Sequence, residues 1–471
     1  MVRTRFAAAL ITSTAAIVGA VAVPASAHGA TAAGAQASVW ATYPDGSALL
    51  SALPAVGFGR LQGKLPTVSV DDTTRYQTVA GIGASLTESS ATVLDAAPAA
   101  ARQAVMQDLF SPTAGIGLSY LRQPLGASDF ATSAYSFDDG SPDPGLTRFS
   151  TARDQADVLP LVAQAHALDP DLRLMLTPWS APGWMKDSAT MVGGTLLDAD
   201  RVTYATYLAR AVADYASYGA PVDALTLQNE PTYAPPDYPG MPLTVSQEAA
   251  LADATASALA SAGQGSVHLV GNDDNWSTEP RAAALLAAAP ALSGAAFHCY
   301  AGDVGAQSSF HAAVPSADVY LSECTGGSWG TGFGGDLDWA VSNLLIGGLR
   351  NWARTVTMWN AVLDPSGGPH TGGCTGCRGV VTLDPTTGTE TRNAEYYALG
   401  QVARFVRPGA VRVASSDVPG GLRSVALVDP DGRHVLVVLN QGSAAADFRV
   451  IWHGTQARSS LPAGGVETLV W

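Results

Sequence analysis

Two stretches, ALTLQNEP at residues 224–231 and DVYLSECTGG at residues 318–327, decide how this chain folds. Each is an apolar run with strand character that ends on a glutamate, Glu230 in the first and Glu323 in the second. An acid at the carboxyl end of a buried parallel strand faces the mouth of a barrel, where barrel enzymes carry out their chemistry. We therefore expect these two acids to meet across a cleft.

Apolar runs of the same kind recur along the chain between about residues 76 and 364. Both faces of these runs are apolar, as in parallel strands that are covered on both sides. In order they are TVAGIGASLT, GLSYLRQPLG, RLMLTPWSAP, ALTLQNEP, SVHLVGNDD, GAAFHCYAG, DVYLSECTG and TVTMWNAVLD. Helix-like stretches with apolar spacing near 3.6 residues, such as 198–219 and 244–263, lie between them.

This alternation of strand and helix predicts the fold class α/β, as a (β/α)8 TIM barrel over residues 71–405. A doubly wound open sheet is the alternative, and it would need a glycine-rich phosphate turn after its first strand. The sequence GIGASLT has two glycines there but lacks the third at the required offset, which favours the barrel.

The pattern changes after about residue 405, and residues 406–471 read as a C-terminal antiparallel β-domain. SVALVDPDGRHVLVVLN (424–440) predicts two strands joined by a turn, and further strands follow at 448–455 and 466–471. The segment 38–70 begins with short strands around the turn PDGS, and we expect it to join the same domain. The prediction is an accessory β-sandwich built from the C-terminus plus an N-terminal segment.

The first residues read as an export signal. A basic start, an apolar alanine-rich core and a small-x-small end at Ala27 predict a signal peptide over residues 1–27, with residues 28–37 as a flexible N-terminus. A membrane anchor is the alternative, which the polar Thr-Ser-Thr at 12–14 disfavours. We expect a secreted, extracellular protein with no stable membrane insertion.

The chain has 40 acidic and 25 basic residues in its 471, giving a net charge of −15. This balance disfavours nucleic acid and anionic polymers as partners, because both require a basic surface. No cluster of His, Cys and Asp has the spacing of metal ligands, so we expect no metal and no cofactor. The sequence does not indicate an oligomeric state.

Four cysteines are present. In an exported protein, the close pair Cys374 and Cys377 predicts a local disulfide that holds a loop. A zinc site is the alternative for such a pair, but no second pair completes it. Cys299 and Cys324 end two neighbouring strand-like runs; buried free thiols are one interpretation, and the sequence leaves their redox state open.

Polar and aromatic side chains follow the apolar runs, as on the catalytic face of a barrel. On this count of strands, Glu230 and Glu323 end the fourth and seventh strands, which lie roughly opposite each other around an eight-stranded ring. Paired carboxylates on either side of one bond carry out glycoside hydrolysis. A helix cap or an ion pair is the alternative role for either acid alone, and the presence of two, with Asn229 beside one, favours the catalytic pair.

At these residues the chain resembles glycoside hydrolase family 30, which includes glucosylceramidases and β-1,6-glucanases. The motifs that carry the resemblance spread over the predicted mature chain in family order. They are GIGASLTESSA (81–91), LRQPLGASDF (121–130), TPWSAPGWMK (177–186), LQNEP (227–231), SECTGG (322–327), WNAVLDPSGGPH (359–370) and RNAEYYALGQVARFVRPGAVRV (392–413). Ile82 stands in the first motif where phenylalanine is usual.

The resemblance implies a role for each matching residue. Glu230 would be the general acid/base and Glu323 the nucleophile of a retaining enzyme. Arg122 would keep Glu323 ionised and oriented. The other residues implied to bind or approach the sugar are Asn229 at its 2-hydroxyl, Asp129 and Trp179 at its far hydroxyls, Trp359 under its apolar face, Tyr300 near the nucleophile and His298 on the acid/base side.

The leading interpretation is a secreted retaining β-glycosidase whose carbohydrate partner is a β-1,6-glucan or a related β-glucoside. A glucosylceramidase acting on a glycolipid headgroup is the alternative within the family. The loop at 367–385 has few apolar residues that could face a lipid, which favours the glucan. A non-catalytic carbohydrate-binding protein is the alternative of another class, and the presence of both glutamates disfavours it.

Overall fold

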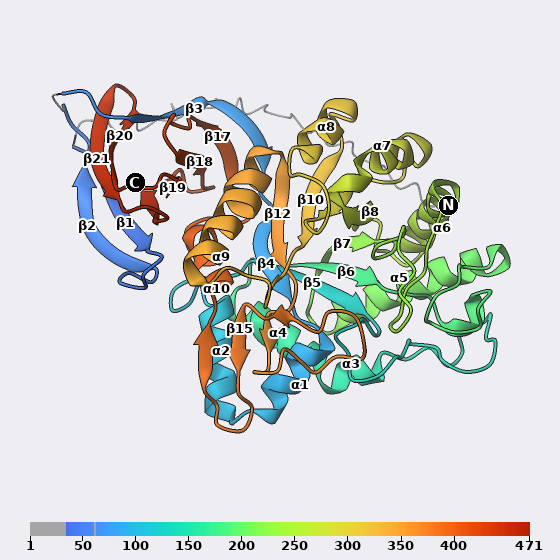
Figure 1. The fold of residues 1–471 in the computed structure, drawn as a ribbon. Helices are drawn as coiled ribbons and strands as arrows, with labels where there is room; N and C mark the ends of the chain where they lie inside the picture. Colours follow the sequence, from blue (N-terminus) through green and yellow to red (C-terminus); the bar gives the residue numbers. More distant parts are fainter. Residues whose placement is uncertain (1–33, 61–62) are drawn as a thin grey trace, which may run out of the picture. The chain divides into compact units, whose positions relative to one another are not determined.

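A computed structural model describes residues 34–60 and 63–471 of the chain. Eight parallel strands close into a barrel, which confirms the predicted fold class (Figure 1). In sequence order they are β4 (Gly81–Ser85), β5 (Tyr120–Leu125), β6 (Arg173–Pro178), β7 (Val222–Thr226), β8 (His268–Asn275), β9 (Gly294–His298), β10 (Asp318–Glu323) and β12 (Ala353–Met358). Each of the eight apolar runs supplies one strand, and β12 closes the ring by pairing with β4.

Helices follow the barrel strands and surround them on the outside (Figure 1). Their bounds are α1 (Glu88–Ala96), α2 (Ala99–Phe110), α3 (Ala152–Ala156), α4 (Val158–Leu168), α5 (Arg201–Ser217), α6 (Val245–Ser261), α7 (Glu279–Ala288), α8 (Ala306–Ala313), α9 (Phe333–Trp339) and α10 (Ala394–Ala403). A π-helical stretch, Ala340–Gly348, continues α9. At the start of α6, Thr244 and Gln247 form a reciprocal capping box, as the sequence there favours.

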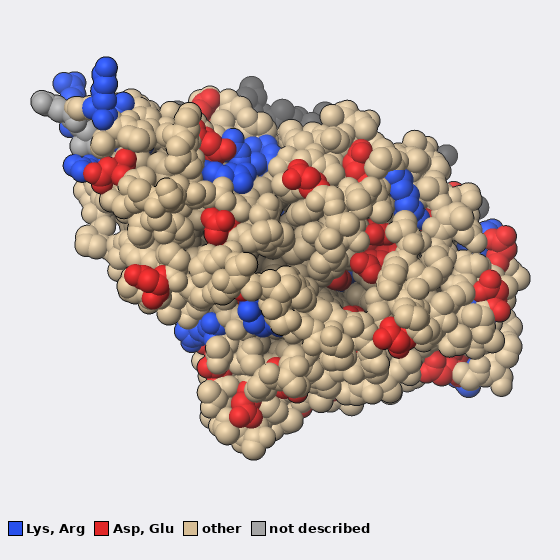
Figure 2. All heavy atoms as spheres, in the orientation of Figure 1, with Lys and Arg blue, Asp and Glu red and all other residues tan. Residues whose placement is uncertain are grey.

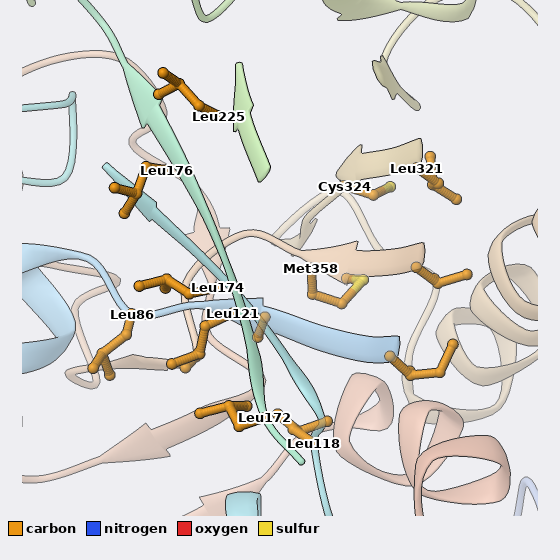
Figure 3. Packing of buried hydrophobic residues seen from close by; sticks show 14 of the residues in the cluster. Leu86, Leu118, Leu121, Leu172, Leu174, Leu176, Leu225, Leu321, Cys324 and Met358 are labelled. Atoms are coloured by element: carbon orange, nitrogen blue, oxygen red, sulfur yellow. The ribbon is translucent and has the colours of Figure 1, made fainter. Parts of the chain in front are cut away.

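The core has two layers because side chains alternate between the faces of each barrel strand. Leucines such as Leu121, Leu174 and Leu225 belong to the large cluster outside the barrel, and Figure 3 shows them with Cys324 and Met358 beside the strands. A second, smaller cluster contains Tyr120, Met175, Ala224, Val270, Ala296 and Tyr320. These packed residues fix the ends of the strands, and therefore the site that the ends carry.

The second domain is a β-sandwich of nine connected strands. In spatial order they are β2 (Ser51–Gly57), β1 (Gln36–Thr42), β22 (Val466–Val470), β19 (His434–Asn440), β18 (Leu422–Val428), β17 (Val411–Ser415), β3 (Thr67–Thr78), β20 (Ala446–Trp452) and β21 (Thr455–Leu461). Because β1 pairs with β22 and β3 with β17, the N-terminal segment joins the C-terminal domain as predicted. The core of the sandwich is a separate cluster that includes Phe448 and Trp452.

The bounds of the N-terminal strands differ from those expected. The strand β1 begins at Gln36, inside the stretch 28–37 that was expected to be flexible, because Gln36 and Ala37 pair with Gly57 and Val56 of β2. The strand β3 continues to Thr78, past the boundary at residue 70, because β17 pairs with it to its end. The predicted signal peptide lies outside the described residues. No helix in the described ranges combines the length and apolar character that a membrane crossing requires.

Short strands join the loops at the carboxyl ends of the barrel strands. They are β11 (Gly326–Gly327) with β14 (Cys377–Arg378), and β13 (Val362–Leu363) with β15 (Val381–Leu383) and β16 (Glu390–Arg392). The pairing of β11 with β14 ties the segment after Glu323 to the cysteine-containing loop. Figure 2 shows a hollow in the surface over β6 and β7, with Asp and Glu side chains in and beside it.

Candidate active site

The two predicted glutamates lie at the same end of the barrel. Glu323 is the last residue of β10, and Glu230 follows β7 by four residues. Nδ1 of His298 is 3.4 Å from Oε1 of Glu230 and 3.9 Å from Oε1 of Glu323. The two carboxylate oxygens are therefore no farther apart than the sum of these distances. Their side chains are 17% and 8% exposed, so a substrate can reach both.

Behind the glutamates lies a layer of fully buried charges. Arg122 on β5 donates from Nη1 to Glu323 at 2.5 Å and from Nη2 to Asp273 on β8 at 2.9 Å. Burial raises the cost of the charged form of Asp273, but the charge of Arg122 and hydrogen bonds from His298 and Ser322 outweigh it and lower the pKa of Asp273. Asp273 is therefore an anion that holds Arg122 in place against the nucleophile.

His298, at the end of β9, is a second buried cation of this layer. Its Nε2 is 3.1 Å from Oδ1 of Asp273, while Nδ1 faces the two glutamates. Burial lowers the pKa of His298, but the charge of Glu323 and hydrogen bonding to Asp273 prevail and raise it to about 10. At neutral pH His298 is protonated, so two cations lie among three carboxylates.

Tyr300 touches the nucleophile candidate directly. Its hydroxyl donates to Oε1 of Glu323 at 2.8 Å, the oxygen that Arg122 leaves free. The backbone N–H of Tyr300 donates to Oδ1 of Asn275 at the end of β8, which fixes the loop after β9. Both oxygens of Glu323 are thus held by hydrogen-bond donors, which sets the orientation of its carboxylate.

Asn229 also belongs to this network. Its Oδ1 accepts from Nη2 of Arg122 at 2.7 Å, which leaves its side-chain N–H groups free of Arg122. Its backbone N–H donates to the carbonyl of Pro178, which ends β6. Asn229 is therefore oriented by the same guanidinium that orients Glu323.

Aromatic rings form one wall of the site. Trp179 after β6 and Trp359 after β12 stack with centroids 5.0 Å apart, and the guanidinium of Arg122 lies 4.9 Å from the ring centre of Trp179. Phe130 packs edge-on against Trp359. Each indole is only 2% exposed, so the ring surface that either offers to a sugar is narrow.

Asp129 closes the site on the side of the cysteine-containing loop. Its backbone carbonyl accepts from the N–H of Thr371, and Gly373 lies against its side chain. Burial, followed by the charges of Glu323 and Glu230, raises the pKa of Asp129 well above its usual range. A protonated Asp129 can donate a hydrogen bond to a ligand as well as accept one.

The four cysteines form two disulfides. Cys374 pairs with Cys377, with a Cα–Cα distance of 5.6 Å, and both pack with the aromatic cluster of Phe130, Trp179 and Trp359. Cys299 and Cys324 are also paired, with a Cα–Cα distance of 5.3 Å. The interpretation of these two cysteines as free thiols was wrong, because the adjacent strands β9 and β10 end side by side and bring the two Cα atoms within bonding range.

A cavity of about 620 Å³ continues from the nucleophile side of the site. Tyr300 and Thr325 line it next to Glu323, and Trp329 and Trp339 line it farther out. These two tryptophans are 58% and 42% exposed, in contrast to Trp179 and Trp359. The cavity combines aromatic surface with the polar side chains of a sugar-binding cleft.

The structure thus places every predicted site residue at this end of the barrel. Residues 34–60 and 63–471 contain no group of three or more His, Cys, Asp or Glu that could hold a metal ion. The arrangement offers two accessible carboxylates, one with both oxygens fixed and one beside a protonated histidine. Such a pair can transfer a proton to a leaving oxygen and attack the carbon that carries it.

Asp273, Thr226, Ser322 and Tyr238 are site residues that the sequence analysis missed. Asp273 accepts from Thr226 and Ser322 as well as from Arg122. Tyr238 packs against the aromatic cluster, and burial and the charge of Glu230 raise its pKa. Asp273 lies in the acidic end of SVHLVGNDD, which is a signal that could have been used. Tyr238 lies in a loop with no comparable motif.

Comparisons with known proteins agree with this geometry. The model of the Glycosyl hydrolase family 30 TIM-barrel domain matches residues 79–406, and that of the Glycosyl hydrolase family 30 beta sandwich domain matches residues 409–469. The chain is 33% identical over 478 residues to an endo-1,6-beta-D-glucanase of Neurospora crassa, covering 93% of this chain and 97% of the relative. It is 28% identical over 404 residues to the lysosomal acid glucosylceramidase of Mus musculus, covering 78% and 76%.

Solved structures resemble the whole described architecture. SrfJ from Salmonella typhimurium superposes with a TM-score of 0.87 at 27% identity, covering 93% of this chain and 99% of that one. An endo-β1,6-glucanase superposes with a TM-score of 0.87 at 26% identity, with the same coverage.

Proposed function

This chain belongs to glycoside hydrolase family 30, and from that premise we propose that it cleaves β-1,6-glucan or related β-glucosides with retention of anomeric configuration. It is a glycoside hydrolase, and carbohydrate is its substrate class. The observation that carries the proposal is the pair Glu230 and Glu323, whose carboxylates both lie within 4 Å of Nδ1 of His298. Relatives named endo-1,6-β-glucanases, at 31–33% identity, support the linkage.

The first half of the reaction uses Glu323 as the nucleophile. One of its oxygens attacks the anomeric carbon, the bond from that carbon to the glycosidic oxygen breaks, and Glu230 gives its proton to the departing oxygen. Arg122 and Tyr300 hold the carboxylate of Glu323 in the attacking orientation. The side chain therefore loses little conformational entropy when it reaches the transition state. The product of this step is a covalent glycosyl ester of Glu323.

In the second half, Glu230 takes a proton from water and the water oxygen attacks the same carbon. The ester bond breaks and the carboxylate of Glu323 is restored. Asn229, oriented by Arg122, is placed to hydrogen-bond the sugar where charge develops in the transition state. Asp129 and the edges of Trp179 and Trp359 would hold the hydroxyls and the apolar face of the same sugar.

The cavity beyond Tyr300 supports a glucan as the substrate. Its outer wall contains Trp329 and Trp339, with Asp336 and Asp338 between them. Exposed indoles and carboxylates next to one another suit a second sugar, which has both an apolar face and hydroxyl groups. A ceramide would bury its chains better against a continuous apolar wall.

Product analysis on a substrate panel tests the proposed function. The protein is incubated with β-1,6-glucan, β-1,3-glucan and a glucosylceramide, and the initial anomer of the product is followed by NMR. We expect β-anomers from β-1,6-glucan, and no products with Glu323→Gln. Hydrolysis of the glucosylceramide alone would assign the alternative substrate. An initial α-anomer would exclude the retaining mechanism.

We also propose that the protein is exported. The predicted signal at residues 1–27 supports this, and so do the two disulfides, which persist in oxidising compartments. N-terminal sequencing of protein from the culture medium of the producing cell tests it. A mature start near His28 is the expected result, and protein retained in the cell with Met1 intact would contradict it.

A further inference from the structure

A second cavity, of about 460 Å³, lies at the opposite ends of the barrel strands from the glutamates. Asp318, which begins β10, and Arg354 on β12 line it, while Glu323 ends β10. A six-residue strand spans roughly 20 Å, so the two sites are separate. The end of β3 supplies the remaining wall, with Arg75 and Tyr76.

Aromatic side chains give this cavity a rigid frame. His311 and Trp352 line it and stack with centroids 3.6 Å apart, and Tyr76 packs edge-on against Trp352. The backbone of Trp352 has a φ of 73°, in the left-handed region that bulky residues rarely adopt. Trp352 stands in the turn after the helical stretch that precedes β12, where a left-handed residue commonly ends a helix.

Arg412 is a buried charge of this region. Its guanidinium lies 3.6 Å from the ring centre of Tyr76 and 5.5 Å from that of Trp352, and the residue is only 7% exposed. Its one side-chain hydrogen bond goes from Nε to Gln77 at 2.9 Å. Among the described residues, no carboxylate lies within ion-pair distance of Arg412 or Arg75.

The carboxylates nearby already have partners. Asp318 pairs with Arg354, and Asp417 pairs with Arg350 at 2.6 Å. Burial lowers the pKa of Arg412 to about 10, opposed by Tyr76 and assisted by the charge of Arg350, and burial and the charge of Arg412 lower the pKa of His311. Arg412 is therefore a buried cation behind the cavity wall, with no counter-ion among residues 34–60 and 63–471.

A buried charge without a partner is costly, and cation–π contacts recover only part of that cost. Figure 2 shows Lys and Arg side chains gathered over the region where β3, β17 and β12 lie in Figure 1, on a chain with a net charge of −15. Guanidinium groups match the geometry of carboxylates and phosphates, and the volume of the cavity is that of a small-molecule site.

We propose that this cavity binds the oxyanion group of a small ligand of about monosaccharide size, a carboxylate or a phosphate, with Arg75 as its charged contact and the charge of Arg412, which lies behind Tyr76 and Gln77, adding to the attraction. Tyr76 and Trp352 hold the Arg412 guanidinium at a fixed angle. The ligand binds at the opposite end of the barrel from Glu323 and does not compete with the substrate of the active site.

Isothermal titration calorimetry on the whole protein tests this proposal. The probes are glucose 6-phosphate, glucuronate, inorganic phosphate and, as the uncharged control, glucose. We expect one saturable site for at least one of the anions, none for glucose, and weaker binding as salt is raised from low ionic strength. Equal affinity for inorganic phosphate and glucose 6-phosphate would mean that the free oxyanion is the ligand, which also supports the site.

Substitutions locate the binding. Arg412→Gln, which removes the charge behind Tyr76, should weaken binding several-fold. Arg75→Gln changes an exposed residue, keeps the protein folded and should weaken binding several-fold. Arg458→Gln, which removes an equal charge on β21, and Glu323→Gln, which alters the active site, should leave it unchanged. No saturable heat with any anion, or a loss shared by Arg458→Gln, would overturn the proposal.

Discussion

The backbone N–H of Glu230 donates to the carbonyl of Asp273 at 2.9 Å, and both residues have positive φ, 46° and 41°. Non-glycine residues in this region cost about 1–3 kcal/mol each and persist where the surroundings impose them. The bond couples the loop that carries the acid/base candidate to the anion that holds Arg122. The loop after β7 and the end of β8 therefore fix the position of Glu230 relative to Arg122.

Asp273→Asn should therefore damage both stability and activity. It removes one partner of a buried ion pair with Arg122, a change that costs about 3–5 kcal/mol in such pairs. Denaturant unfolding measures the stability, and kcat/KM on an aryl β-glucoside measures the activity. Asp274→Asn is the matched control, because Asp274 is equally buried but accepts from Thr232 outside the charge layer. Similar losses in both variants would contradict the role given to Asp273.

Glu230→Ala should discriminate between leaving groups. A poor leaving group needs the proton of Glu230, so its rate should fall by about 10²–10⁴-fold. An activated aryl glucoside leaves without that proton, so formation of the glycosyl-enzyme should change far less. Azide, which fits the space of the lost carboxylate, should restore turnover of the aryl substrate and give a β-glycosyl azide. Equal losses on both substrates would contradict the acid/base role.

His298 gives the stability of the protein a defined dependence on pH. The pKa of His298 is raised in the folded state to about 10, above the value of about 6.5 expected when unfolded. Its stabilising contribution is therefore complete below about pH 6.5 and is lost as pH rises through about 10. The difference in melting temperature between wild type and His298→Asn should shrink over this interval. A difference that stays constant from pH 6.5 to 10 would show that the charge of His298 does not contribute.

Replacement of Asp129 by asparagine should preserve activity, whereas truncation of its side chain to alanine should not. Burial and the charges of Glu323 and Glu230 raise the pKa of Asp129 and so favour its neutral form, and Asn has nearly the same shape and hydrogen-bonding groups as that form. Asp129→Asn should change kcat/KM little, whereas Asp129→Ala should lower it about tenfold or more through a lost contact. Steady-state kinetics on an aryl β-glucoside compare the two. A loss in Asp129→Asn as large as that in Asp129→Ala would show that the charged form is needed.

The Cys299–Cys324 disulfide should stabilise the fold and the nucleophile together. It closes a loop over a sequence separation of 25, for which the loss of chain entropy in the unfolded state is worth roughly 3 kcal/mol or slightly more. It also joins the residue before Tyr300 to the residue after Glu323. The double variant Cys299→Ala/Cys324→Ala should unfold at lower denaturant and show a reduced kcat. Cys374→Ala/Cys377→Ala is the control, because its short loop predicts a smaller loss of stability.

The sequence by itself determined the barrel, the two-segment sandwich and the positions of both glutamates. These follow from local regularities, since a buried parallel strand is apolar on both faces and the residues at or just after its carboxyl end lie at the mouth of the barrel. The roles predicted for Arg122, Asn229 and Tyr300 came from the resemblance to the family, because strand periodicity alone assigns no role to them.

Only the tertiary structure decided which groups meet. The pairing of Cys299 with Cys324 depends on how β9 and β10 end relative to each other, which no spacing in the sequence shows. The role of Asp273 depends on a bulge in β8, between Gly271 and Asp274 in its pairing with β9, and on a positive φ that turns this region of the chain. The partnerless Arg412 stands in an ordinary strand pattern, VRV, and becomes distinctive only when strands from both domains surround it. Contacts between distant segments depend on closure of the barrel, and such contacts leave no periodic signal in the sequence.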